Sequence, residues 1–314
     1  MRLSKKTKNR GGLKKGRIAE NIQLFSMALP GYVFAILFCY LPLFGVVIAF
    51  QKYNPNLGLF ASKWVGFENF EFFFKSNDFF LIMRNTIGYG ILFLFLDNFF
   101  NILLAYAFYN VKSKMALKFY QTTAIFPRFL SMVLVAFVVY AFLGPNSGML
   151  NKVIILLGGK EIDWYASPQY WPFILAIVQI WKGVGMGCLL YYATMIGIDE
   201  SLMEAAEIDG AKKRHQFLYI ILPELGTLLG LQLIMGVGSL VNGDFGLFYQ
   251  VPMNIGMLYP TTDIISTYVY RAFEGGTNME RTAAIGLFQS VSGTVLVLLS
   301  NAVVRKVSPE NSMF

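Results

Sequence analysis

The sequence has little of the chemistry on which enzymes and metal sites depend. Its 314 residues include one histidine, His215, and two cysteines, Cys39 and Cys188. A catalytic centre needs several His, Asp, Ser or Cys side chains at one cavity, and this chain offers no such constellation. The nucleotide-binding pattern G-x-x-x-x-G-K-[ST] is absent as well. We therefore expect no enzyme active site, no metal site and no disulfide.

Charged residues are also scarce, and apolar residues take their place. Asp, Glu, Lys and Arg make up 14% of the chain, whereas 56% is hydrophobic and the mean hydropathy is +0.54. This composition excludes an ordinary soluble domain. A bilayer core of about 30 Å requires about 20 mostly apolar residues per helix. Six runs of that length predict an all-α integral membrane protein with six transmembrane helices: Leu24–Phe50, Thr86–Tyr109, Phe119–Leu143, Tyr170–Ile196, Pro223–Phe248 and Thr282–Val304.

The positive charges are unequally divided between the two sides of these spans. Eight Lys and Arg residues lie in the N-terminal tail, and further ones follow the second, fourth and sixth spans, while the opposite side has fewer over longer loops. Because positive residues are retained in the cytoplasm, both termini are predicted to be cytoplasmic. The net charge of +8 does not indicate nucleic acid, since the basic residues cluster at membrane borders, where anionic lipid attracts them.

The chain is predicted to form a single membrane domain with two short tails. Residues 1–23 are a basic cytoplasmic N-terminal tail, 24–304 the six-span domain, and 305–314 a cytoplasmic C-terminal tail. Between the first two spans, Gly66–Phe74 mixes aromatic rings with carboxylates, which predicts a short helix at the membrane surface. Pro127 falls inside the third run and is expected to kink it.

The loop 198–222, between the fourth and fifth spans, is far more charged than its surroundings. Ser201 is placed to cap a helix, with Glu204 three residues later as a capping box requires, and Gly210 is expected to end that helix. Physical chemistry leaves two interpretations equally open. The loop is either a connection capped for its own stability or a docking element for another protein.

The spacing of residues in this loop resembles that of a known family. It is similar to the EAA loop of binding-protein-dependent ABC importer permeases at Glu204, Ala205, Ala206, Gly210, Ile220, Leu222 and Pro223. Further stretches resemble the carbohydrate branch of that family, the maltose-type permeases and especially those for complex oligosaccharides: 44–50, 53–55, 66–70, 181–183 and 263–271. The resemblance implies the six-helix fold of type I ABC importer permeases.

This resemblance also implies a mechanism and a set of partners. In the family, the EAA helix is a coupling helix seated in a groove of a cytoplasmic ATPase, which binds ATP and Mg in place of this chain. Glu204 would pair with an Arg of the ATPase, Ala205 and Ala206 would permit close packing, and Gly210 would set the bend. The implied partners are a second, homologous permease in a heterodimer, two ATPase subunits, an extracellular solute-binding protein and a carbohydrate, at a bacterial cytoplasmic membrane.

Polar residues at membrane depth mark the expected substrate pathway, because they are costly in lipid and usually face a cavity. Together with the resemblance, they predict a pathway lined by Arg128, Met132, Trp181, Gly183, Met186, Ser239, Gly243 and Asp244. For Lys182, Asp97 and Asp244 the alternative is snorkelling to the membrane surface or pairing within the helix bundle. For the small residues of the fifth span, the alternative is close helix packing.

These observations favour the permease subunit of an ABC importer for a carbohydrate, in particular an oligosaccharide. The alternative is the permease of an importer for another solute, such as phosphate, a peptide or an amine, which the EAA loop alone does not exclude. The charge of the sugar also stays open, because Arg128 stands where the family more usually has His and an Arg can bind a carboxylate.

Overall fold

The computed structural model describes residues 10–145, 148–275 and 279–307. In this part of the chain, four helices are long and apolar enough to cross a membrane, and the number rises to six if each of two bent helix pairs counts as one span. The predicted all-α membrane architecture is therefore confirmed. The four straight candidates are Ile22–Phe50, Phe79–Tyr109, Pro168–Ile196 and Met279–Lys306.

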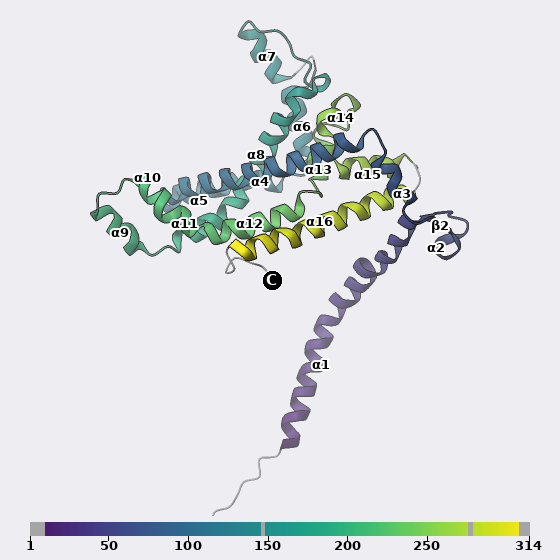
Figure 1. Ribbon diagram of the computed structural model, residues 1–314. Coiled ribbons are helices and arrows are strands. Elements are labelled where there is room, and N and C mark those ends of the chain that lie inside the picture. Colours follow the sequence, from purple (N-terminus) through teal and green to yellow (C-terminus); the bar gives the residue numbers. More distant parts are fainter. Residues whose placement is uncertain (1–9, 146–147, 276–278, 308–314) are drawn as a thin grey trace, which may run out of the picture.

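The third predicted span is broken rather than merely kinked. It consists of α5 (Lys114–Ile125), a 3₁₀ turn (Phe126–Phe129) and α6 (Met132–Leu143), and its two arms meet at 99°. Pro127 in the turn has no N–H to continue the helical ladder. Ser131 then starts α6, because its hydroxyl accepts a hydrogen bond from the N–H of Leu134. Figure 1 shows α6 rising steeply away from the bundle.

The fifth predicted span, Pro223–Phe248, differs from the structure at both ends. A bent pair of helices replaces it, with an angle of 58° after Glu224. The second arm, α12 (Gly226–Ser239), stops at Ser239, and Phe245 begins a separate helix. The elements involved are α10 (Lys213–Gln216), a π-helical turn (Phe217–Ile221), α11 (Leu222–Glu224), α12, and α13 (Phe245–Gln250).

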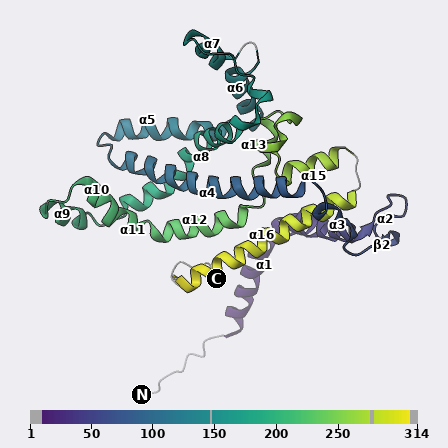
Figure 2. The same cartoon turned by 45° about the horizontal axis from the view of Figure 1, so that its top comes forward.

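Helices α4 and α8 form the centre of the bundle. α4 (Phe79–Tyr109) and α8 (Trp171–Ile196) share the most extensive helix contact, and α12 packs on α4 and on α16 (Met279–Val307). Both views show these helices side by side (Figures 1 and 2). Large buried side chains fill the contacts, among them Trp171, Leu175, Tyr191, Met195, Ile221, Leu225, Ile234 and Leu247.

The two ends of the bundle carry different short elements. One end, here called the α9 end, holds α9 (Glu200–Ile208), and the opposite α15 end holds α15 (Ile265–Glu274) (Figure 1). A small antiparallel ribbon pairs Gln51 with Trp64. The other short elements are β1 (Gln51–Lys52), α2 (Gly58–Ala61), β2 (Lys63–Trp64), α3 (Glu68–Phe74), α7 (Met149–Leu156), 3₁₀ turns at Trp164–Ala166, Pro168–Tyr170 and Gly256–Leu258, and α14 (Tyr259–Thr262).

The helix predicted in Gly66–Phe74 is present as α3, and it packs against α16. Asn69 is buried, and its amide donates hydrogen bonds to the carbonyls of Ala49 and Gln51, both at 2.9 Å. This short helix is thereby tied to the end of the first span.

The segment before α15 is held on the first turns of α4 through its main chain. The Asn85 amide donates to the carbonyl of Asp263 (3.0 Å), and the Tyr89 hydroxyl to that of Thr261 (2.6 Å). Asp263 in turn forms a buried ion pair with Arg271 (Nη2–Oδ2, 2.5 Å). The segment is therefore fixed from both sides.

The first span stands apart from the rest of the chain. α1 (Arg10–Ala35) continues through a π-helical turn (Ile36–Tyr40) into a 3₁₀ helix (Leu41–Phe50), and only this last part packs against α16 and α3. In Figure 1, α1 projects from the bundle. Apolar side chains of α1 and of the π-helical turn are exposed, as Phe25, Met27, Phe34, Phe38 and Tyr40 illustrate.

A glycine allows α5 to approach α8 closely. A Cβ added at Gly185 would lie 1.8 Å from the carbonyl oxygen of Ala124. We predict that Gly185→Ala destabilises the protein by about 1–3 kcal/mol or more, because the backbone of α5 must move. Gly286→Ala in α16 is the matched control, since its added Cβ would meet no atom within 4 Å. Thermal unfolding of the purified protein in detergent measures both, and equal midpoints for the two variants would contradict this account.

Candidate functional site

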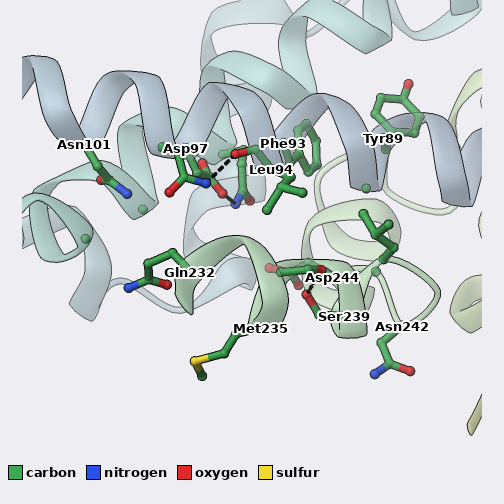
Figure 3. Close-up of a pocket in the computed structure, with 18 of the residues that line it drawn as sticks. Tyr89, Phe93, Leu94, Asp97, Asn101, Gln232, Met235, Ser239, Asn242 and Asp244 are labelled. Carbon is green, nitrogen blue, oxygen red and sulfur yellow. Dashed lines mark hydrogen bonds between the residues drawn. The ribbon is translucent and has the colours of Figure 1, made fainter. Parts of the chain in front are cut away.

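A cavity of about 650 Å³ lies between α4, α8, α12 and the loop that follows α12. α4 contributes side chains spaced four residues apart, which a helix places on one face: Tyr89, Phe93, Asp97 and Asn101. Figure 3 shows Asp97 and Asn101 on α4 facing Gln232 on α12 across the gap. The cavity thus has aromatic rings towards the α15 end and amide and carboxylate groups further along.

Glycines of α8 make room for the polar side chains of α4. A Cβ at Gly187 would lie 2.5 Å from both terminal atoms of the Asn101 amide, and one at Gly183 would lie 4.0 Å from Asp97 Oδ1. Because these two glycines are one turn apart, the α8 surface is flat where Asp97 and Asn101 rest on it.

Two polar pairs join α4 to α8 inside the bundle. The Gln179 amide donates to Asp97 Oδ2 at 3.0 Å, and the Tyr191 hydroxyl donates to Asn98 Oδ1 at 2.5 Å. Asp97 Oδ1 is buried and has no hydrogen-bond partner among the described residues. Gln179 is therefore the sole protein donor to the Asp97 carboxylate within the described structure.

Lys182 is buried, with 9% of its surface exposed. Its ammonium donates to the carbonyls of Leu130, Arg128 (3.4 Å) and Pro127 (3.5 Å). Those carbonyls lie at the break between α5 and α6, where the Pro127 carbonyl also accepts from the N–H of Leu130 at 3.2 Å. Of the two alternatives for Lys182, the structure therefore shows pairing within the bundle, with backbone carbonyls as the acceptors.

Six of the eight residues predicted for the substrate pathway line this cavity: Arg128, Gly183, Met186, Ser239, Gly243 and Asp244. Met132 and Trp181 are not among the lining residues; Met132 packs beside Gly246, and Trp181 is 43% exposed. Asp244 accepts a hydrogen bond from the N–H of Leu247 (3.1 Å) and so starts α13. Gly243 has φ +59°, and a Cβ there would lie 2.5 Å from Ile264 Cδ1.

The sequence prediction missed the polar residues that line the cavity beside Asp97. Asn98 and Asn101 on α4 and Gln232 on α12 all line it. The signal that could have found Asn101 is its spacing of four residues from Asp97 within an otherwise apolar run. Gln232 is a lone amide in its run and offered no comparable pattern.

The charged loop 198–222 forms the helix expected of it, but a different residue caps it. Asp199 precedes the helix, and its carboxylate accepts a hydrogen bond from the N–H of Ser201 (3.0 Å). The expected Ser201 cap is therefore wrong, and Ser201 lies in the first turn. The hydrogen bonds from Ser201 hold the pKa of Asp199 below its usual value.

Gly210 ends α9 as predicted. Its φ is +78°, and the N–H groups of Ala211 and Gly210 bond the carbonyls of Ala206 (2.9 Å) and Glu207 (3.0 Å). This is the Schellman arrangement, which requires a left-handed residue. Met203 packs on the bundle, whereas Glu204 and Ala205 are exposed and Ala206 is partly buried. Leu222 and Pro223 lie on α11, at the bend of the fifth span.

We predict that Gln179→Leu destabilises the protein by about 1–3 kcal/mol, because it leaves the Asp97 carboxylate without its donor at membrane depth. The double variant Asp97→Leu with Gln179→Leu removes both partners and is expected to recover much of that loss. Thermal unfolding in detergent of the two single variants and the double variant gives the coupling energy. Strictly additive losses would show that the pair contributes nothing.

Comparison with known proteins identifies the family of this chain. Residues 98–309 match the family model described as "Binding-protein-dependent transport system inner membrane component". The chain is 32% identical to the polygalacturonan/rhamnogalacturonan transport system permease protein YteP of Bacillus subtilis (strain 168), over 94% of this chain and 91% of that one. Protein LplB of the same organism is 31% identical, over 91% and 90%.

A solved structure has the same fold. It is a bacterial ABC transporter involved in the import of the acidic polysaccharide alginate, with a TM-score of 0.84, 29% identity, and coverage of 93% of this chain and 98% of that chain. Both the family match and the curated relatives cover well over half of this chain. The chain therefore belongs to the inner membrane components of binding-protein-dependent transport systems: it is a multi-pass permease subunit of an ABC transporter, and the ATPase activity lies in partner subunits.

Proposed function

We propose that this permease carries an oligo- or polysaccharide through the cavity between α4, α8 and α12. The observation that supports this most is the chemistry of the cavity lining. Amide, carboxylate and hydroxyl groups of Asn101, Gln179, Gln232 and Ser239 supply donors and acceptors for sugar hydroxyls. The rings of Tyr89 and Phe93 supply apolar faces against which a sugar ring can pack.

The names of relatives support the same substrate class. They include permeases for polygalacturonan/rhamnogalacturonan and for arabinooligosaccharides, the latter 26% identical over 81% of this chain. The alginate transporter adds a third carbohydrate. Phosphate, peptides and amines have no counterpart among these names, so we place them second.

α9 is the proposed coupling helix to the ATPase. It projects at one end of the bundle (Figure 1), and its outward side combines the carboxylate of Glu204 with apolar Leu202 and Ile208, which is 87% exposed. Ala205 lies between them and leaves the surface shallow. The carboxylates of Glu200 and Glu207 are exposed on α9 as well. A surface that combines carboxylates with small and apolar groups suits close docking to a basic groove.

The proposed assembly contains a second homologous permease, two ATPase subunits and an extracellular binding protein. The apolar side chains exposed between Ile22 and Phe34 of α1 need a covering partner or lipid. A related alginate transporter has been solved with a pentasaccharide-bound periplasmic protein, which supports the last partner. The Lys and Arg excess in the N-terminal tail and near α9 supports cytoplasmic termini.

We predict that Glu204→Lys abolishes transport while membrane insertion is unchanged, because it places a positive charge where the ATPase groove is expected to be basic. Glu224→Lys, on α11 outside the α9 surface, is the charge-matched control. Uptake in vesicles and co-purification of the ATPase measure the two effects. Normal uptake by Glu204→Lys would remove the coupling assignment.

The proposed substrate class is tested by the ATPase activity of the assembled complex in lipid. We expect stimulation when a binding protein loaded with an oligosaccharide is added, because a loaded binding protein favours the state in which the ATPase subunits close. Stimulation by peptides or phosphate alone would contradict the carbohydrate assignment and favour the second candidate.

A further inference from the structure

The break in the third span places a cation in the wall of the cavity. Arg128 lies in the 3₁₀ turn between α5 and α6, and it lines the cavity. The ion pairs found among the described residues are Glu71–Lys75 and Asp263–Arg271. Within this part of the chain, the Arg128 guanidinium has neither a carboxylate partner nor a hydrogen-bond acceptor. An arginine side chain always carries its charge and offers five N–H donors, so these donors are available to a ligand.

The two carboxylates of the same cavity each accept one hydrogen bond from a protein group other than Arg128. Asp97 accepts from the Gln179 amide at 3.0 Å, and Asp244 accepts from the N–H of Leu247 at 3.1 Å, at the start of α13. Neither forms an ion pair with Arg128. Arg128 is thus the charged side chain of this cavity whose polar atoms make no hydrogen bond among the described residues, while Asp97 keeps one oxygen, Oδ1, without a partner.

Lys182 fixes the backbone from which Arg128 extends. Its ammonium reaches the carbonyls on both sides of that residue, Pro127 and Leu130, and the carbonyl of Arg128 itself. These bonds join the turn to α8, which forms another wall of the cavity. They also place a second positive charge behind the turn, which strengthens the attraction for an anion in the cavity.

From this arrangement we infer that Arg128, positioned by Lys182, binds a carboxylate of the transported sugar, so that the preferred substrate is an oligosaccharide containing uronic acid. The inference rests on the proposed transport of carbohydrate through this cavity. A guanidinium and a carboxylate form two parallel hydrogen bonds, which give both attraction and orientation. A neutral sugar offers the guanidinium hydroxyl acceptors but no opposite charge.

The test uses two sugars of the same length, an oligogalacturonide and its methyl ester, in which each carboxylate is replaced by an uncharged ester that is one methyl group larger. Initial uptake of each is measured in vesicles that hold the complete complex and its binding protein. The uptake rate of each variant is divided by that of the wild type on the same sugar. Any preference of the binding protein for one sugar therefore cancels from this ratio. Arg128→Gln is expected to lower uptake of the acid about tenfold while the ester changes by less than about twofold.

Two further variants separate recognition from folding. Lys118→Gln removes a charge from an exposed site on α5 outside the cavity, and we expect it to leave both uptake rates unchanged. Lys182→Met is expected to reduce uptake of the acid more than that of the ester, and Lys182→Arg to restore the ratio in part, because it keeps a cation at the carbonyls. Co-purification of the ATPase confirms assembly of each variant.

Each result has a defined meaning. The role of Arg128 would be overturned if Arg128→Gln lowered the uptake of acid and ester equally, or lowered neither. It would also be overturned if the wild-type complex took up the ester and not the acid. If Lys182→Met lowered the uptake of acid and ester equally, Lys182 would have a structural role only, and its role in positioning Arg128 would be overturned. A wild-type complex that responds to no carbohydrate would contradict the proposed function instead.

Discussion

The structure depends on the rule that backbone polar groups inside a membrane must find partners within the protein. Straight helices obey it automatically, whereas the break between α5 and α6 does not, because Pro127 interrupts the helical ladder there. Lys182 resolves the conflict by donating to three carbonyls of the break from the neighbouring α8. A buried cation without a carboxylate partner is thereby explained. The bend that it stabilises is also what allows α6 to leave the bundle and the cavity to open beside α4.

Small and polar residues have different roles at the centre of the bundle. Gly187 of α8 leaves room for Asn101 of α4, and amides and a carboxylate meet there between clusters of buried apolar side chains. In lipid, helix association relies on such close packing and on hydrogen bonds between helices. For the small residues of the fifth span, close packing and a place in the cavity wall are compatible: a Cβ on Gly236 would lie 2.2 Å from Leu94 Cδ1 of α4, and Gly236 also lines the cavity.

Much of the architecture could be predicted from the sequence, because the length and hydropathy of most spans can be read directly from it. The helix over Glu200–Ile208, its end at Gly210, and α3 were also predictable from local signals. The end of the fifth span was not, since its residues are apolar enough to continue, and the helix stops at Ser239 for conformational reasons such as the left-handed Gly243. The cap of α9 was misassigned because Asp199 and Ser201 are both good capping residues. The set of polar side chains that meet at the cavity depends on how α4, α8 and α12 pack together. This packing cannot be predicted from the hydropathy of any one segment.

The attachment of the α15 end to α4 has a consequence for how this surface can change over evolutionary time. Asn85 and Tyr89 bind main-chain carbonyls of Asp263 and Thr261 rather than their side chains. The identity of the residue at position 261 therefore matters little to these two bonds. Substitutions at this position can change the surface of the α15 end while both bonds to α4 persist. This attachment lets that surface diverge in sequence while the helix packing of the bundle stays the same.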